Sequence, residues 1–274
     1  MEDINDHVPI FEEASYSTEV KESMSVGSTV TTVRATDKDS GKNGEVLYTI
    51  KSQTSKPDVF RIDPKSGVIS TRLKLDREAE QTHTIVVEAT DQGPPAERLS
   101  ASTTVTITVL DENDNYPQFS QKTYYLQVEE DIDFSRRPVV GRVAAYDEDE
   151  GLNSIIQYSL IGGNTANQFS VDEDSGDITV TKQLDHETTK TYRLVIRAQD
   201  RGSPTRSNTT QVIINLDDVN DHSPKFYSQY FQEAVAENVP VGFSIVRIQA
   251  YDSDEGENAR ISYALGSSPL VRLQ

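Results

Sequence analysis

The chain has 274 residues, which is enough for two ordinary domains and part of a third. It carries 45 acidic against 26 basic residues, and the net charge of −19 disfavours nucleic acid and anionic membrane as partners while favouring cations. No apolar run is long enough to span a bilayer and no apolar segment follows the acidic N-terminus, so we expect neither a membrane span nor a signal peptide in this fragment.

Short strands are predicted along the whole chain. Apolar and polar residues alternate, for example with Val105, Ile107 and Val109 on one face, and β-branched residues are frequent. Turn sequences containing Gly or Pro separate these runs, and no segment keeps a helical period. About seven strands in roughly 110 residues are typical of an immunoglobulin-like sandwich, so we predict an all-β fold of tandem Greek-key β-sandwiches. The absence of Cys and Trp excludes the antibody-type core.

An acidic sequence recurs three times and defines the predicted domains. It occupies Asp3–His7, Asp111–Asn115 and Asp218–His222, and a spacing of roughly 110 residues indicates tandem units. The last unit should be poorly ordered alone or lean on the second repeat. The predicted boundaries are 1–7 for the end of a preceding repeat or linker, 8–115 for one repeat, 116–222 for a second, and 223–274 for the truncated N-terminal part of a third.

Other acidic motifs keep the same period. Each unit has an isolated Glu and an Asp-x-Asp pair, and the first two units add Leu-Asp-x-Glu and Ala-x-Asp-x-Gly sequences. A lone acidic pair usually lies on a solvated face, but solvation does not require the same residue types at a fixed period. Carboxylates this dense repel one another unless a cation lies among them. Ca²⁺ prefers such oxygen ligands, whereas zinc and copper prefer the missing Cys and His clusters, and Mg²⁺ retains its waters.

Two other uses of paired carboxylates are excluded. An EF-hand loop needs a bidentate Glu at position twelve, but that position, counted from each Asp-x-Asp pair, holds Tyr48, Tyr158 or Tyr263. We expect these tyrosines to be core residues of the following strand. A glycoside hydrolase would also pair carboxylates, yet their repetition at unit boundaries suits a structural metal better than one catalytic cleft. We therefore predict that the chain is not an enzyme.

Together these motifs resemble the extracellular cadherin repeat, over essentially the whole chain up to Leu265. The sequence Asp111–Phe119 looks most like non-classical cadherins of the flamingo (seven-pass) group, with Fat/Dachsous and protocadherin types as alternatives. The resemblance implies sandwiches joined by calcium-binding linkers, with about three Ca²⁺ ions at each complete junction.

The resemblance also implies a ligand set for each junction. At the first complete junction, two ions would be held chiefly by Glu22, Asp76, Glu78, Asp111, Asp114, the Glu112 carbonyl and Asp149. The third would take Asn113, Asp147, Asp149, Asp200 and the carbonyls of Asn115 and Asn153. The next junction would use Glu130, Asp185, Glu187, Asp218, Asn220, Asp221, Asp252, Asp254 and the carbonyls of Val219, His222 and Asn258. The N-terminal remnant, with one ion at most, offers Asn5, Asp37, Asp39, Asp91 and the carbonyls of His7 and Asn43.

The four histidines are assigned minor roles. His7 and His222 replace the family's usual Asn, which is tolerable if only the backbone carbonyl binds. His83 aligns with a tyrosine of the second repeat and should be a half-buried packing residue. His186 replaces Arg77 of the preceding repeat and should point to solvent.

The resemblance implies calcium-dependent cell–cell adhesion or recognition in the extracellular part of a plasma-membrane protein. The implied partner is a cadherin ectodomain on an apposed cell, the same protein, rather than nucleic acid or a small molecule. The alternative is a heterophilic receptor or mechanical spacer segment without self-adhesion. Asn208 begins the sequence Asn-Thr-Thr and is a glycosylation candidate if the protein is secreted.

Overall fold

The structure, a computed structural model, describes residues 3–265. The chain divides into two compact units, each of which is described by itself. The first unit comprises Met1–Tyr116 with Asp147–Ile155 and Asp200–Arg206, and the second comprises the remaining segments. Residues 1–2 and 266–274, which fall at the two ends of the predicted domain scheme, lie outside the described residues.

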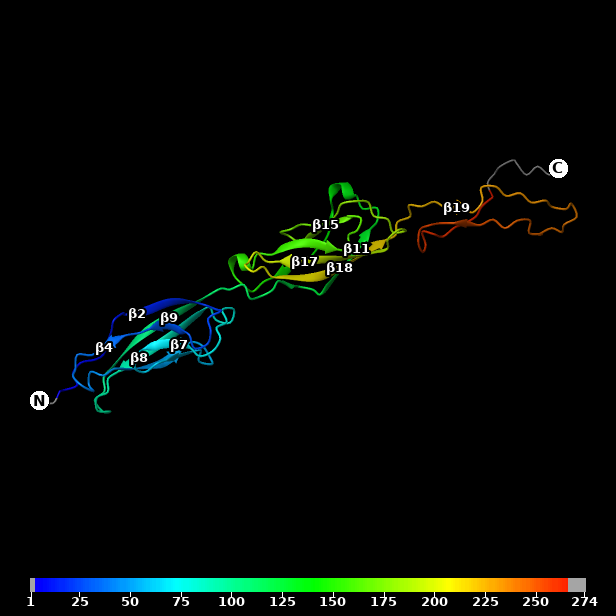
Figure 1. Ribbon diagram of the computed structural model, residues 1–274. Coiled ribbons are helices and arrows are strands. Elements are labelled where there is room, and N and C mark those ends of the chain that lie inside the picture. Colours follow the sequence, from blue (N-terminus) through cyan, green and yellow to red (C-terminus); the bar gives the residue numbers. More distant parts are fainter. Residues whose placement is uncertain (1–2, 266–274) are drawn as a thin grey trace. The chain divides into compact units, whose positions relative to one another are not determined.

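The first unit contains nine strands. They are β1 (Ile10–Phe11), β2 (Ser15–Lys21), β3 (Thr29–Thr32), β4 (Ala35–Thr36), β5 (Leu47–Gln53), β6 (Phe60–Ile62), β7 (Val68–Thr71), β8 (Thr82–Thr90) and β9 (Ser100–Leu110). One sheet has the order β2-β9-β8-β5 and the other β3-β7-β6, while β1 pairs with β4. Figure 1 shows β2, β9 and β8 side by side, with β7 in the other sheet.

The sandwich of the second unit repeats this topology. Its strands are β10 (Gln118–Phe119), β11 (Thr123–Glu129), β12 (Val139–Arg142), β13 (Ala145–Tyr146), β14 (Gln157–Gly162), β15 (Phe169–Val171), β16 (Asp177–Val180), β17 (Thr191–Gln199) and β18 (Ser207–Asp217). The sheets are β11-β18-β17-β14 and β12-β16-β15. In both units the first long strand pairs in parallel with the last, β2 with β9 and β11 with β18.

Alternating side chains give each sandwich its core. On β9, Val105, Ile107 and Val109 are buried while the residues between them are only partly buried, as a half-buried strand requires. Ile214 of β18 and Leu194 of β17 have the same role in the second unit. Each unit has one such cluster, and burying apolar side chains is the main favourable term in the stability of each.

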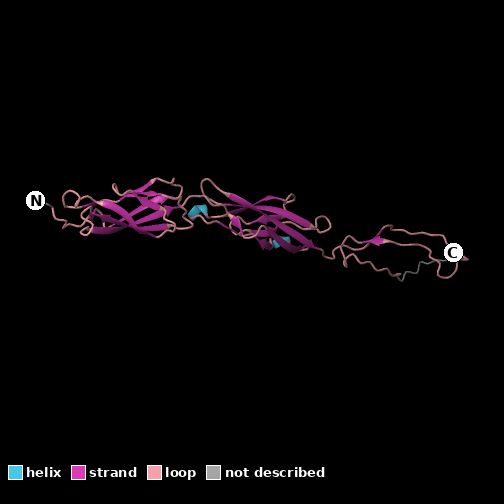
Figure 2. Cartoon of the chain, turned by 90° about the horizontal axis from the view of Figure 1, so that it is seen from below, coloured by secondary structure: helices cyan, strands magenta, loops and turns pink. Residues whose placement is uncertain are grey.

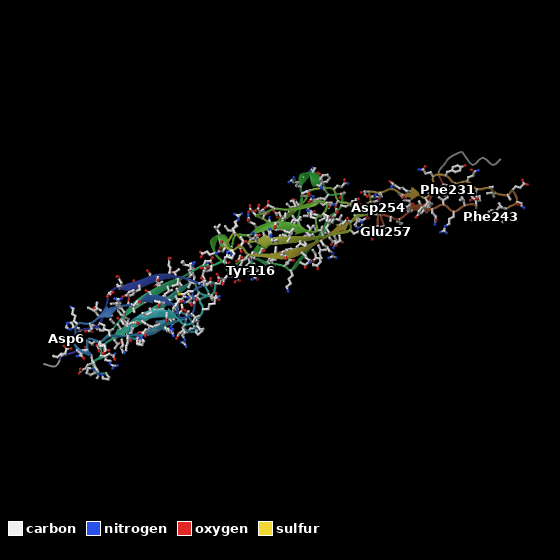
Figure 3. The ribbon with its side chains drawn as sticks, in the orientation of Figure 1. Asp6, Tyr116, Phe231, Phe243, Asp254 and Glu257 are labelled. Carbon is white, nitrogen blue, oxygen red and sulfur yellow. The ribbon has the colours of Figure 1, made fainter. Side chains whose placement is uncertain are left out.

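The segment that follows the second sandwich has little regular structure. It contains only the two-residue strands β19 (Lys225–Phe226) and β20 (Ala250–Tyr251), and Figure 2 shows it mostly as loop. Apolar side chains stay exposed there, including Phe231 (37%) and Phe243 (54%), which project from the chain in Figure 3. These side chains have no opposing sheet to bury them among the described residues.

The tyrosine prediction holds for two of the three positions. Tyr48 and Tyr158 are buried, and the hydroxyl of each accepts a hydrogen bond from the backbone N–H of an alanine at 2.8 Å. Tyr263 is 57% exposed, so the prediction of a core position is wrong for it. No strand follows Tyr251 among the described residues, so no layer forms over the ring.

Helical structure is limited to two short 3₁₀ turns among residues 3–265, η1 (Phe134–Arg136) and η2 (Gly151–Asn153), drawn in cyan in Figure 2. Within the part of the chain that the structure describes, no helix is long and apolar enough to cross a membrane.

Candidate metal centre

Acidic side chains gather where strands of the first unit end. Strand β9 ends at Leu110, directly before Asp111, and β2 ends at Lys21, directly before Glu22. The backbone N–H of Glu22 donates to the Leu110 carbonyl at 3.2 Å, which ties these two ends together. Buried Leu75 anchors the adjoining loop and thereby positions Asp76 and Glu78. The sequence therefore places these acids together through strand pairing and one apolar anchor.

Glu22 is the most deeply buried of these acids, with 2% of its surface exposed. One oxygen, Oε1, accepts a hydrogen bond from the backbone N–H of Arg77 at 2.7 Å. The other, Oε2, is buried with no hydrogen-bond partner among the described residues. Burial, opposed by that hydrogen bond and reinforced by nearby Glu78 and Asp114, raises the pKa of Glu22 to about 7. Without a cation, a substantial fraction of this carboxyl is protonated at neutral pH, where an exposed Glu is ionised.

Two groups of three carboxylates share Glu78. Glu22, Glu78 and Asp114 form one group, and Glu78, Asp111 and Asp149 form the other. Within each group, ligand atoms of all three residues lie within 4.8 Å of one another. A hollow of roughly 520 Å³, lined by Asp76 among others, opens beside the first group. The arrangement offers two adjacent places for a cation with one bridging carboxylate.

The Asp147–Ile155 segment supplies the remaining acids of this cluster. Asn115 donates from its side-chain amide to Asp149 at 2.8 Å, and Asn153 donates to Asp111 at 2.9 Å. Burial raises the pKa of both Asp147 and Asp149 above the usual aspartate value. Ionisation of these two aspartates is therefore unfavourable for the same reason as ionisation of Glu22, because burial removes water from the charged form.

The other predicted ligands lie on the Asp200–Arg206 side. Asp200 is 1% exposed, and its two oxygens accept hydrogen bonds from the backbone N–H groups of Gly202 and Arg206. Asn113 donates to the Pro204 carbonyl at 2.7 Å, which leaves its Oδ1 atom buried without a partner among the described residues. Asp200 thus shapes this loop in addition to its predicted role, and Asn113 presents a free amide oxygen.

A guanidinium that the sequence did not assign to the site lies among the acids. Arg77 contacts Glu78 at 2.9 Å, Asp111 at 3.4 Å and Glu150 at 2.7 Å, and only 12% of its side chain is exposed. Burial opposes its charge, but the ion pairs with Glu150 and Glu78 outweigh burial and raise the pKa of Arg77. Arg77 neutralises part of the cluster, yet several carboxylate oxygens still have no positive partner.

The distribution of unpaired buried atoms fits a hard cation. Among the described residues, twelve buried side-chain nitrogen or oxygen atoms have no hydrogen-bond partner, and ten of them are oxygens. Buried polar atoms are normally hydrogen-bonded, so such a concentration needs an explanation. Ca²⁺ is bound by carboxylate and amide oxygens of this kind. All ten oxygens belong to residues predicted as ligands, namely Asn5, Glu22, Asp37, Asp111, Asn113, Asp147, Glu187, Asp218 and Asp254.

A second cluster of the same design lies in the second unit. Glu187 is shared between one group with His186 and Asp218 and another with Asp221, His222 and Asp254. Asn258 donates to Asp218 at 2.7 Å, as Asn153 does to Asp111. Burial raises the pKa of Glu187. Glu130 differs from Glu22 because both of its oxygens accept backbone N–H groups, from His186 and Val219.

The prediction that His186 points to solvent is wrong. Its side chain is 7% exposed and lies 3.4 Å from both Asp218 and Glu255. The His186 backbone N–H donates to Glu130 at 2.6 Å, as the Arg77 N–H does to Glu22, and this bond holds the loop in place. His222 also contributes its ring, because Nδ1 lies 2.6 Å from Asp221. That hydrogen bond raises the pKa of His222. His83 is more buried than expected, at 3%, and Phe60 packs edge-on against it.

Several predicted ligands are not members of the carboxylate groups described above. Asp76 and Asp185 are exposed and accept hydrogen bonds from their own loops. Asn220 is exposed. The carbonyls of Glu112 and Val219 accept backbone hydrogen bonds two residues on, at 2.9 and 2.7 Å. These contacts show local turn geometry, and the assignments themselves stay predictions.

The N-terminal acids form a smaller cluster that includes residues missing from the predicted set. Asp6, His7 and Asp39 lie together, and the His7 ring is 2.7 Å from Asp39. Asp3 accepts hydrogen bonds from Asn43 and Ser40, as Asp111 does from Asn153 and Glu150. Asp3 has the repeat position of Asp111, so the period alone could have identified it. Asn208 lies exposed at the start of β18, where a glycan would be accessible.

Comparisons with known proteins agree with this architecture. A model of the cadherin domain matches residues 16–110 and 124–217. The chain is 50% identical over 273 residues to the protocadherin-like wing polarity protein stan of Drosophila melanogaster. The match covers 96% of this chain and 8% of that protein. It is 46% identical over 266 residues to human cadherin EGF LAG seven-pass G-type receptor 1, covering 97% of this chain and 9% of the receptor. The chain therefore spans less than a tenth of either relative.

Solved structures with the same fold include two tandem-repeat cadherin fragments. Mouse cadherin-23 EC22-24 has a TM-score of 0.78 and 35% identity, covering 93% of this chain and 80% of that one. Protocadherin gammaB7 EC3-6 has a TM-score of 0.83 and 30% identity, covering 94% and 62%. Neither the family nor the fold indicates an enzyme, and cadherin domains bind Ca²⁺ between their repeats. The chain belongs to the cadherin family, as a run of extracellular cadherin repeats similar to those of the seven-pass cadherins.

Proposed function

We propose that the chain is a segment of a calcium-stiffened extracellular rod that supports homophilic cell–cell adhesion. The observation that carries the calcium part is the set of ten buried ligand-type oxygens without a hydrogen-bond partner among the described residues, which all fall in the predicted acidic clusters. The relatives, which by name include seven-pass receptors, support a place on the outer side of a plasma membrane. Millimolar Ca²⁺ would suit such a low-affinity extracellular module.

Calcium would act by compensating charge. In the metal-free protein, burial chiefly raises the pKa of Glu22, Asp147 and Asp149, and repulsion from neighbouring carboxylates adds to the shift. Bound Ca²⁺ would turn these repelling groups into shared ligands and fix the segments that carry them. About three ions at the first cluster, held by the predicted residues, form our working model. The second cluster would hold its ions through Glu187, Asp218 and Asp254.

The adhesive part is tested with beads that carry the chain on their surface. Homophilic adhesion predicts aggregation in Ca²⁺ and dispersal in chelator. Beads that bind Ca²⁺ yet never aggregate would favour the alternative, a heterophilic receptor or mechanical spacer segment. Coating the same beads with Glu78→Gln protein provides a control, because Glu78 bridges the two carboxylate groups of the first cluster.

A further inference from the structure

The two sandwiches present different residues on the same outward sheet face. In the first unit, one row across β2, β9 and β8 consists of Ser17, Thr106 and Thr84, which are direct cross-strand neighbours. Such a row of small hydroxyl side chains is an ordinary solvated surface. It serves as an internal reference for the second unit, which has the same strand order and pairing.

The corresponding row of the second unit is apolar and basic. Tyr125 of β11 pairs with Ile213 of β18, and Ile213 pairs with Arg193 of β17. Tyr125 is 71% exposed. Directly paired side chains on one face lie about 5 Å apart, so these three form one continuous surface. The Ser and two Thr of the reference row are sufficient for a soluble surface. Solubility therefore does not explain the Tyr, Ile and Arg at the same positions of the second unit.

A second position along the same face reverses charge. Arg197 of β17 pairs with Thr209, and its counterpart in the first unit is Glu88, which pairs with Ser102. Glu88 has its own ion pair, with Lys51 at 2.9 Å. Arg197 instead donates to the Ser159 hydroxyl at 3.3 Å. Among residues 3–265, no carboxylate forms an ion pair with Arg197 or Arg193, so both charges are available to a partner.

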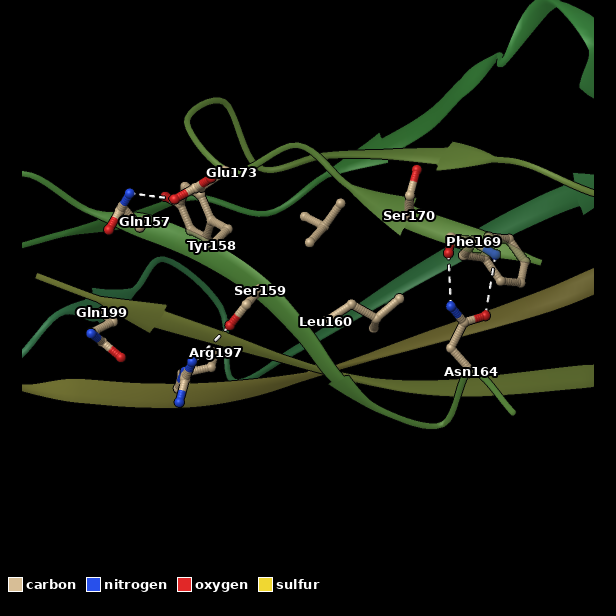
Figure 4. Close-up of a pocket in the computed structure, with 11 residues that line it drawn as sticks. Gln157, Tyr158, Ser159, Leu160, Asn164, Phe169, Ser170, Glu173, Arg197 and Gln199 are labelled. Carbon is tan, nitrogen blue, oxygen red and sulfur yellow. Dashed lines mark hydrogen bonds between the residues drawn. The ribbon is translucent and has the colours of Figure 1, made fainter. Parts of the chain in front are cut away.

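A hollow adjoins the arginine end of this face. It has a volume of roughly 480 Å³ at the edge strand β14, and Ser159, Arg197 and Gln199 line it. Figure 4 shows the Arg197–Ser159 hydrogen bond beside it, and Asn164 holding the backbone of Phe169 on the opposite wall. The hollow gives the face a concave border against which a partner side chain could pack.

We propose that this face, defined by Tyr125, Ile213, Arg193 and Arg197, binds an acidic surface of a second copy of the chain. The proposal rests on the homophilic function proposed above and names its surface. Charge complementarity selects the occupant, because a chain with 45 acidic and 26 basic residues presents mainly carboxylates to unpaired arginines. Tyr and Arg are also the residue types that most often dominate binding energy at interfaces.

The size of the face sets the expected strength. Three strands spaced about 5 Å apart and about 25 Å long give a patch of a few hundred Å², well below the roughly 800 Å² per partner of a stable complex. Self-association should therefore be weak, with a Kd on the order of 0.1 to 1 mM. Many such contacts at a cell boundary would add by avidity.

The test compares sedimentation and bead aggregation of four proteins in Ca²⁺. The double variant Arg193→Glu/Arg197→Glu and the single variant Tyr125→Ser should each weaken self-association at least tenfold. Thr84→Glu, at the reference position of Arg193 in the first unit, should leave it unchanged. Circular dichroism confirms that every variant keeps its β-structure, and higher salt should weaken the wild-type association by screening the arginines.

Each outcome decides one question. Loss in both second-unit variants with an unaffected Thr84→Glu protein supports the surface. Wild-type strength in both variants overturns the surface but leaves homophilic adhesion standing. A wild-type chain that stays monomeric up to about 1 mM and does not aggregate beads overturns both the surface and the homophilic function.

Discussion

The two acidic clusters share a plan but differ in the cation that the protein itself supplies. The first contains the guanidinium of Arg77, which is charged at every physiological pH. The second has His186 at that position and His222 where the first has Asn115, so its internal positive charge depends on protonation. The negative charge of the carboxylates is therefore partly neutralised at every physiological pH in the first unit. In the second unit it is neutralised by these side chains only when a histidine is protonated. The comparison shows that the repeated motifs determine where the carboxylates lie. Single substitutions, such as Arg77 to His186, determine which side chain neutralises them.

The largest expected effect is a loss of stability that is confined to one unit at a time. Leu75 and Leu184 are almost fully buried, and each directly precedes the ligand loop of its own cluster. Leu75→Ala should destabilise the first unit by about 2–4 kcal/mol through the lost burial and the cavity left behind. Leu184→Ala should do the same to the second. Hydrogen exchange of the strand amides measures each unit separately, and equal loss of protection in both units for either variant would contradict two independent cores.

The next effect concerns the bridging glutamates. Glu78→Gln and Glu187→Gln should each lower Ca²⁺ affinity by about 10- to 100-fold, at their own cluster alone. Each glutamate belongs to two groups, so one neutralised side chain weakens both. Titration calorimetry measures the affinity, with Glu88→Gln as a control because Glu88 lies on the outward sheet face. An unchanged affinity in Glu78→Gln would remove the proposed bridge.

Exchanging the internal cations tests the comparison most specifically. Arg77→His should destabilise the metal-free first unit by about 1 kcal/mol at alkaline pH, where the imidazole is neutral and the ion pairs with Glu78 and Glu150 are lost. His186→Arg should stabilise the metal-free second unit by a similar amount. Urea unfolding in chelator gives both values. If neither exchange changes stability, the internal cations do not compensate the clusters.

Much of this arrangement could be predicted from the sequence because the acidic motifs recur at a fixed period. The period located Glu78 and Glu187 about 110 residues apart, and strand alternation located the core. The burial of the His186 ring could not be predicted, since the ring lies against Asp218 and Glu255, which come from other parts of the chain. The grouping of Asp147–Ile155 with the first unit is likewise a tertiary property that no local pattern contains.

The smallest expected effect is the pH dependence that His83 contributes to the first unit. Burial lowers the pKa of His83 below its usual value of 6.5. When pH falls through 6.5, the unfolded chain takes up a proton that the folded unit does not, so stability is full above that pH and declines below it. His83→Tyr introduces the residue of the second unit, Tyr192, and should abolish this decline. Melting in Ca²⁺ at about pH 7.5 and about pH 5.5 measures it, and an equal decline in both proteins would exclude His83 as the cause.

Thermal unfolding with and without calcium tests the central claim most directly. The buried oxygens of Glu22, Asp147 and Glu187 that lack hydrogen-bond partners among the described residues predict that about 1 mM Ca²⁺ raises the melting temperature well above that in chelator. The same Mg²⁺ concentration should do much less. The gain should be reduced in Glu78→Gln protein. An identical melting temperature in Ca²⁺ and in chelator would contradict the account.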